Sequence, residues 1–408
     1  MTGVDFYRGQ MSNDADVDRV ADLAQRVVAE HDPKSVPIPE YLAACYDAGL
    51  SWVHFPEGFG GLGLSRRLQA VADGVLQGAG GPVPLGLNPM GYGMAAPTIR
   101  EHAQDDDLKK SWLRPLASTE HIWCQLFSEP GAGSDLAGLA TSAVPDGEDW
   151  VINGQKVWTS LAHRARWGLL LARTDPDVAK HKGLTYFVVD MHGPGVETRP
   201  LRQMTGQAEF NEVYFSDARI PDAHRLGAVG NGWNVAMTTL MNERSALGGS
   251  GSRRGAGTIS EAVSLWAARP DLHTPVLRDR LTQLWLRSEA QRLTSERSRA
   301  AATMGGPGPE GSIGKMVGAE LNQLIYQFCM DLLGTEGTLY HGYSSGRDPE
   351  NESDWRGPIQ QRFLRSRANT IEGGTSEVMR NILGERILGL PGDLRADAGM
   401  PWKEIPRG

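Results

Sequence analysis

Cysteine is scarce in this chain of 408 residues, and its scarcity excludes two classes of protein. Only three cysteines occur, Cys45, Cys124 and Cys329, and they are widely spaced. No CxxC pair or mixed His/Cys spacing typical of a metal site is present, so we expect no metal. An odd number of isolated cysteines argues against a disulfide framework and is typical of a protein from a reducing compartment.

Long apolar segments are also missing. Residues 1–19 are polar and acidic, without the apolar core of a signal peptide. No apolar run approaches the roughly 20 residues that a membrane-spanning helix needs. We therefore expect no membrane span and a cytoplasmic location. The net charge of -8 offers no general attraction for nucleic acid, so we expect no nucleic-acid partner.

The periodicity of the apolar residues changes twice along the chain. Residues 16–116 carry helical spacing, as in Val17, Val20 and Val27. Residues 123–221 hold β-rich runs without helices between them, which predicts an antiparallel sheet or barrel. Within "DWVINGQKVWTS", Asn153-Gly154 predicts a hairpin turn between two strands. Helical patterns return from about residue 232 to residue 390.

This order predicts an α+β protein with three domains. We expect an N-terminal α-helical domain (1–122), a middle antiparallel β-barrel-like domain (123–229) and a C-terminal helical domain (230–391). Residues 392–408 have the composition of a loose tail, and residues 340–358 that of a long loop. Gly58–Gly63 satisfies the G-x-G-x-x-G spacing of a dinucleotide site, but no strand–helix alternation follows it, and we interpret it as a turn.

The segment "WCQLFSEPGAGSDLAG", residues 123–138, is the first strong motif. Pro130, Gly131 and Gly133 predict a loop with exposed backbone N–H groups, and Ser128 and Ser134 add hydroxyls. Such a loop can hydrogen-bond a polar heterocycle or a phosphate. An ordinary turn is the alternative that the residues alone leave open.

This segment closely resembles the signature of the acyl-CoA dehydrogenase family. Four further segments match family motifs in the family's order: "FPEGFGGLG", "INGQKVWTS", "NEVYFSDARIP" and "GTSEVMRNILGERILGLP". The resemblance implies a C-terminal four-helix bundle, an FAD cofactor and an acyl-CoA substrate. The implied reaction removes hydrogen from the α- and β-carbons of the thioester and yields a trans-2-enoyl-CoA.

The resemblance also implies roles for individual residues. Trp158 would pack against the flavin, Ser128 would hydrogen-bond its ring, and Ser160 would contact its N5 edge. Ser134 would lie near both the flavin and the substrate's pantetheine. The full set implied for the cofactor is Phe127, Ser128, Gly133, Ser134, Trp158, Ser160, Thr375 and Glu377. Thr375 and Glu377 are equally well explained as an N-cap and a first-turn acid of the last helix.

Two carboxylates compete for the role of catalytic base. Family members carry the base either directly before Gly-Thr-Ser or on the helix after the middle domain, directly before an arginine. The first position is Gly373 here, with Glu372 one residue too early, whereas Glu243 precedes Arg244. We therefore assign the base to Glu243.

Helical spacing supports this assignment independently of the resemblance. Glu243 continues three- and four-residue steps through Trp233, Ala236 and Leu240, so it is expected on an apolar stripe. A carboxylate there would be desolvated, which raises its pKa toward the working range of a base. The alternative is a buried structural ion pair. Arg244, Gly373 and Ser134 are the residues that we expect to bind the substrate.

The C-terminal region departs from the family at two places. The family's R-x-x-F-G motif, which binds the FAD pyrophosphate of a neighbouring subunit, corresponds here to "ARPDLHTP", in which Arg269 is retained. Its Q-x-x-G-G-x-G element reads "DLLGTEG", with Asp331 in place of the glutamine. The chain is thus either a divergent homotetramer or dimer of dimers, or one half of a heterotetramer with fewer flavins than subunits.

Other functions stay open at this point. The chain could be a non-catalytic subunit that supports a flavin-bearing partner, or an acyl-CoA oxidase with the same fold. For the dehydrogenase, the resemblance implies an electron-transfer flavoprotein as electron acceptor. Acyl chain length cannot be inferred, because the sequence does not reveal which side chains meet in the pocket.

Overall fold

The computed structural model describes residues 14–247, 253–305, 310–339, 357–392 and 397–406. For residues 14, 243–247, 299–305 and 310 it describes the backbone alone. The chain divides into two compact units. The first comprises Met1–Arg199, Phe210–Asn242 and Gly399–Gly408, and the second comprises Pro200–Glu209 and Glu243–Ala398. The predicted loop at 340–358 lies almost wholly outside the described residues.

Helices form the N-terminal part of the first unit, as the apolar spacing predicts. Val17, Val20 and Ala24 are fully buried on one face of the first described helix. Gly58–Gly63 forms a turn in which Trp52 N donates to Gly60 O (3.0 Å), so the prediction of a turn is confirmed. The helices are α2 (Asp14–Glu30), α3 (Ile38–Asp47), α4 (Gln69–Gly78), α5 (Pro84–Leu87), α6 (Ala96–His102) and α7 (Asp106–Ala117).

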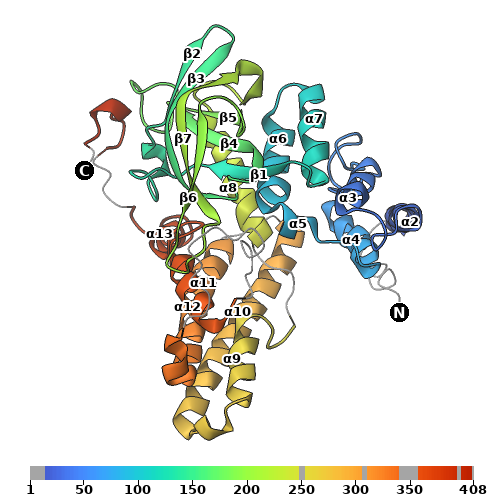
Figure 1. Ribbon diagram of the computed structural model, residues 1–408, viewed down its shortest axis with the longest axis vertical. Helices are drawn as coiled ribbons and strands as arrows, with labels where there is room; N and C mark the ends of the chain where they lie inside the picture. Colours follow the sequence, from blue (N-terminus) through green and yellow to red (C-terminus); the bar gives the residue numbers. More distant parts are fainter. Residues whose placement is uncertain (1–13, 248–252, 306–309, 340–356, 393–396, 407–408) are drawn as a thin grey trace. The chain divides into compact units, whose positions relative to one another are not determined.

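One sheet follows these helices in the first unit (Figure 1). Its path runs β6-β7-β3-β2-β4-β5-β8, and β1 pairs with β4. The strands are β1 (Ile122–Leu126), β2 (Ser142–Asp146), β3 (Asp149–Ser160), β4 (Ala165–Arg173), β5 (Leu184–Asp190), β6 (Val196–Leu201), β7 (Phe210–Pro221) and β8 (Arg225–Leu226).

The prediction of an antiparallel, barrel-like sheet is wrong in two respects. β1 runs parallel to β4, and β2 meets β4 in parallel at Ser142 and Arg173, so the sheet is mixed. The sheet is also open, because the path ends at β6 and β8. The connection from β1 to β4 is a long loop followed by the β2–β3 pair, which returns the chain in parallel without an α-helix; a rule based on intervening helices does not anticipate this.

The predicted hairpin turn at Asn153-Gly154 is wrong as well. Both residues lie inside β3, where the pairing with β7 shifts register. Gly154 is needed because a Cβ there would lie 2.5 Å from Thr141 Oγ1. Asn153 instead exchanges hydrogen bonds with Asp217 on β7 (2.9 and 3.0 Å). The turn occurs six residues earlier, where Gly147, at φ +66°, separates β2 from β3.

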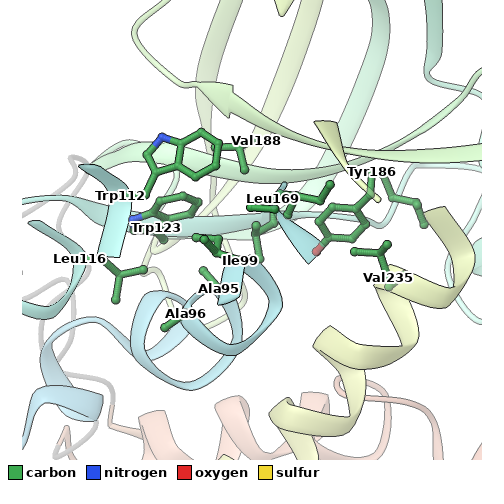
Figure 2. Close-up of a cluster of buried hydrophobic side chains, with 14 of the residues drawn as sticks. Ala95, Ala96, Ile99, Trp112, Leu116, Trp123, Leu169, Tyr186, Val188 and Val235 are labelled. Carbon is green, nitrogen blue, oxygen red and sulfur yellow. The ribbon is translucent and has the colours of Figure 1, made fainter. Parts of the chain in front are cut away.

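The core of the first unit joins its helices to the sheet. Figure 2 shows Trp112, Trp123 and Ile99 packed beneath the sheet with Leu169 and Val188. The Trp112 and Trp123 rings meet edge to face at 6.3 Å. This cluster buries the start of β1, the strand that leads into the first strong motif.

Helix α8 (Gly232–Leu247) begins in the first unit, and its last residues are counted with the second. The second unit contains α9 (Thr258–Ala267), α10 (Pro275–Gly305), α11 (Glu310–Leu333), α12 (Ile359–Ser366) and α13 (Ser376–Arg386). Helices α9, α10, α12 and α13 all contact α11, which is the centre of this unit. The α-β-α order is therefore confirmed, while a bundle of four helices stays a prediction. No helix in the described ranges is long and apolar enough to cross a membrane.

The C-terminal segment is not loose where the structure describes it. Trp402 packs on the sheet side of the first unit, with its ring 4.2 Å from the buried Arg173 guanidinium. Its indole N–H donates to Gly138 O (3.1 Å), and its backbone N–H donates to Val178 O (2.9 Å). Composition misses this contact because a single aromatic residue anchors an otherwise polar segment.

Replacing Trp402 by Ala should destabilise the first unit by about 1–3 kcal/mol, since a cation–π contact and one hydrogen bond are lost. Urea unfolding followed by circular dichroism measures this loss. Trp402→Phe is the matched control, because it keeps an aromatic ring over Arg173. It should lose less than half of the unfolding free energy that Trp402→Ala loses. Equal stability of wild type and Trp402→Ala would show that the segment contributes nothing.

Candidate functional site

The loop after β1 carries four of the eight residues implied for the cofactor. Glu129 and Ala132 exchange backbone hydrogen bonds (3.0 and 3.1 Å), which closes a tight turn at Pro130 and Gly131. No atom lies within 4 Å of a Cβ built on Gly131 or Gly133, so this side of the turn is open. Ser134 is exposed on the same loop. The loop thus presents backbone to an open side, as the motif predicts.

Phe127 has a different environment from the rest of the loop. Its side chain is buried and meets Tyr186 edge to face at 5.8 Å. Its carbonyl accepts a hydrogen bond from Lys156 Nζ (2.9 Å). The side chain therefore serves the core and cannot face a ligand, which leaves Phe127 only a backbone contact with a cofactor.

A buried ion pair, absent from the sequence expectations, holds this loop to β3. Lys156 is fully buried, and its Nζ lies 2.8 Å from Glu129 Oε1. The Glu129 carboxylate also accepts from the backbone N–H groups of Ala140 (2.6 Å) and Thr141 (2.9 Å). Burial raises the pKa of Glu129, but Lys156 and these hydrogen bonds outweigh it and hold the pKa below its ordinary value.

Trp158 stands on a bulge of β3. The pairing of β3 with β7 shifts register between Lys156 and Thr159, and Trp158 has φ +60°. A positive φ is costly for a bulky residue, and such backbone strain clusters at functional sites. Its side chain is 56% exposed, and the Phe210 ring lies beside it, edge to face at 5.9 Å. A large aromatic ring held out at this cost is suited to stack on a planar ligand.

The loop and the bulge are adjacent. Val157 N donates to Ser128 O (2.9 Å), which places Ser128 beside the residue before Trp158. Ser160 ends β3 opposite Phe210 and is half-buried. The structure therefore brings Ser128, Trp158 and Ser160 together along one side of the first unit.

Residues implied by the last motif lie in the second unit. Thr375 caps α13, and its hydroxyl accepts from Val378 N (3.1 Å), which confirms the structural alternative for this residue. Glu377 is exposed in the first turn of α13. Gly373 has φ +62°, a conformation that favours glycine. Lys315 of α11 holds this turn by donating to Gly374 O and to Asn369 O (2.9 Å).

Glu372 is committed to an ion pair. Arg365 binds both of its oxygens (3.2 and 2.8 Å), and Asn369 Nδ2 donates to Oε1 (2.8 Å). A bidentate pair with arginine fixes the orientation of a carboxylate, so Glu372 is held toward Arg365. This geometry disfavours the alternative base.

Glu243 and Arg244 lie in the C-terminal part of α8, and their side chains are outside the described part of the chain. The described half of the helix buries Val235, Ala236 and Thr239. Residues four apart share a helix face, so this buried stripe leads from Thr239 to Glu243. Of the predicted stripe, Ala236 is buried and Trp233 and Leu240 are half-buried, so the burial of Glu243 stays a prediction.

The departures around Arg269 have a structural counterpart. Asp271 binds the Arg269 guanidinium at two atoms (3.1 and 3.0 Å), and Glu336 lies 4.0 Å away. Asp331 is paired with Arg280 (2.7 Å). Both arginines are therefore engaged by acids of this chain, and this surface is a poor fit for a pyrophosphate. Among the described residues, no group of three or more His, Cys, Asp or Glu side chains could hold a metal ion.

Family models match three consecutive parts of the chain. They are the N-terminal domain of acyl-CoA dehydrogenase over residues 14–120, the middle domain over 124–218 and the C-terminal domain over 230–388. The chain therefore belongs to the acyl-CoA dehydrogenase family, whose members are flavoproteins that oxidise CH–CH groups.

Named relatives agree with this assignment. Acyl-CoA dehydrogenase FadE34 of Mycobacterium tuberculosis is 38% identical over 92% of this chain, and the chain spans half the length of that relative. Acyl-CoA dehydrogenase IpdE1 of the same organism is 39% identical over 84% of this chain and 86% of its own length.

Solved structures extend the comparison to the fold. The structure titled "Tcur3481-Tcur3483 steroid ACAD" has a TM-score of 0.70 and 27% identity, and covers 96% of each chain. The ChsE4-ChsE5 complex from Mycobacterium tuberculosis has a TM-score of 0.68 and 28% identity, over 94% of this chain and all of that one.

Replacing Lys156 by Met should destabilise the protein by about 3–5 kcal/mol, because the Glu129 carboxylate would stay buried without its partner. Chemical unfolding measures the loss, and limited proteolysis should show new cleavage within residues 129–141. The double variant Lys156→Met/Glu129→Gln removes the uncompensated charge and should recover part of the stability. A cost below about 1 kcal/mol for Lys156→Met would contradict the structural role of this pair.

Proposed function

We propose that this chain catalyses the FAD-dependent α,β-dehydrogenation of an acyl-CoA thioester to a trans-2-enoyl-CoA, with Glu243 as the base. The observation that carries the proposal is the strained, exposed Trp158 beside the open loop of Ser128 and Gly133. An exposed ring and an open loop do not contribute to core packing. A planar cofactor, in contrast, could stack on the Trp158 ring and accept hydrogen bonds from the backbone N–H groups of the loop.

The residues of this chain would divide the work between binding and proton transfer. Trp158 would stack on the flavin ring, and Ser128 and Ser160 would donate to its polar edge. When bound, the flavin would accept the hydride that leaves the β-carbon. The Glu243 carboxylate would take the α-proton, and Arg244, Gly373 and Ser134 would contact the thioester. A dry helical stripe would keep Glu243 basic enough for that transfer.

The turn after α12 supports the choice of base. Glu372 already neutralises Arg365, whereas α8 leads its buried face toward residue 243. Thr375 and Glu377 would lie near the cofactor, but their capping role accounts for them without it. We therefore regard Thr375 and Glu377 as weaker candidates for FAD contacts than the residues of the first unit.

Partners follow from the same proposal. An electron-transfer flavoprotein would reoxidise the flavin, and oxygen is the alternative oxidant if the chain is an oxidase. The engaged Arg269 specifically favours a second candidate, a subunit of a heterotetramer that leaves one pyrophosphate site unused. The neighbouring structure of the ChsE4-ChsE5 complex makes a two-chain assembly the first alternative to a homotetramer.

Purification distinguishes these assemblies. A homotetrameric dehydrogenase would carry one FAD for each chain, whereas a heterotetramer would carry fewer flavins than chains. Anaerobic titration with short, medium, long and branched acyl-CoAs, and with a thioester that bears a steroid nucleus, would identify the substrate by flavin bleaching. The steroid thioester is included because a solved neighbour is titled a steroid ACAD.

Glu243→Gln should slow flavin reduction by the best thioester at least about 100-fold while the flavin stays bound, since general-base catalysis typically contributes 100- to 10,000-fold. Stopped-flow absorbance under anaerobic conditions measures the rate. Glu372→Gln is the matched control, and it should reduce the flavin at close to the wild-type rate. The assignment fails if Glu372→Gln is the inactive variant and Glu243→Gln is not.

A further inference from the structure

A chain of buried hydroxyls fixes α8 within the first unit. Thr239 Oγ1 lies 3.0 Å from Thr98 Oγ1 on α6 and 2.9 Å from the Tyr186 hydroxyl on β5. All three side chains are fully buried. Figure 2 shows Tyr186 descending from the sheet beside Val235 of α8, with its hydroxyl directed away from the strands.

The protons of these hydroxyls fit one consistent order. Thr98 Oγ1 donates to Met94 O (2.8 Å), so its single proton is used and its oxygen must accept from Thr239. Thr239 has then spent its own proton and must accept from Tyr186. The remaining contact, Thr239 to Val235 O at 3.3 Å, is the longest and the weakest competitor. The order is Tyr186 to Thr239 to Thr98 to the Met94 carbonyl.

Such a chain specifies one position of the helix. Among the described side chains of α8, the rest of the buried face consists of Gly232, Val235 and Ala236, none of which carries a hydrogen-bonding side chain. A buried hydroxyl loses its partners when the helix moves, and an unpaired buried polar group is costly. A second rung lies beside the first, where His102 Nε2 on α6 meets Thr238 Oγ1 at 2.9 Å. Hydrogen bonds from the consecutive residues Thr238 and Thr239 fix both the rotation of α8 about its axis and its position along that axis.

We propose that Thr239 is a positioning residue for the Glu243 carboxylate, and that Tyr186 and Thr98 are its anchors. Thr239 lies four residues before Glu243, so the two share one face of α8 and the fixed turn directly precedes the base. This proposal rests on the proposed function. Thr239 itself touches no substrate and takes no proton from one.

The expected signature is a loss of rate without a loss of binding. Displacement of a catalytic group by about 1 Å can cost on the order of 100-fold in rate. Thr239→Val keeps the side-chain shape but removes the hydroxyl. It should slow flavin reduction at saturating acyl-CoA by about 10- to 100-fold. The acyl-CoA concentration for half-maximal rate should change less than about 3-fold, because Gly373 and Ser134, two of the three residues expected to bind the thioester, lie outside α8.

Conservative variants and a matched control make the test specific. Thr239→Ser restores the hydroxyl and should reduce the flavin within about 3-fold of wild type. Tyr186→Phe removes only the donor to Thr239 and should give an intermediate rate, which keeps the test usable if Thr239→Val does not fold. Ser118→Ala removes another buried hydroxyl, which donates to Pro115 O (3.2 Å) at the C-terminal end of α7. It should lower the thermal midpoint without slowing the reaction.

The experiment uses the flavin-loaded protein, with any partner subunit that it requires, and the acyl-CoA that bleaches wild type fastest. If Glu243→Gln still reduces the flavin, the proposed function fails at its base. If Glu243→Gln is inactive but both Thr239→Val and Tyr186→Phe keep the wild-type rate, the positioning role alone is overturned. Slow reduction in both hydroxyl variants, with rescue by Thr239→Ser, is the result that we expect.

Discussion

The ion pair between Lys156 and Glu129 is the contact on which the candidate site depends. It is buried, and it joins the first strong motif to the strand that carries Trp158. Lys156 also binds Phe127 O, and Val157 N binds Ser128 O, so two successive residues of β3 hold two successive residues of the loop. Without that connection, neither the open turn nor the strained bulge would keep its place.

A second set of buried polar contacts holds α8 in place, as the ion pair holds the loop after β1. Apolar packing alone tolerates small shifts, whereas paired hydroxyls and charges lose their partners when an element moves. Two such contacts of the first unit bear on the candidate site: Lys156 holds the loop after β1, and Thr239 precedes the proposed base on α8. Both are residues that composition or hydrophobic pattern would class as errors in a core, which is often the mark of a functional position.

Sequence patterns succeeded where local rules control the structure. The α-β-α order, the Thr375 cap and the glycine turn at residues 58–63 all follow from spacing and turn chemistry. The sequence patterns failed where residues distant in the chain determine the structure. Gly154 is required by its close approach to Thr141, and Trp402 is held by Arg173. The roles of Lys156 and Thr239 were missed because their partners lie far along the chain. A lysine within the "INGQKVWTS" motif was the one signal that pointed to a buried charge.

A crystal structure of the protein with FAD, together with any partner subunit, tests the account most directly. The account predicts the isoalloxazine ring in van der Waals contact with the Trp158 indole and within hydrogen-bond distance of Ser128. It also predicts an unbroken pair between Lys156 and Glu129 beneath them. A flavin bound elsewhere, or a Trp158 ring covered by protein with no flavin beside it, would contradict it.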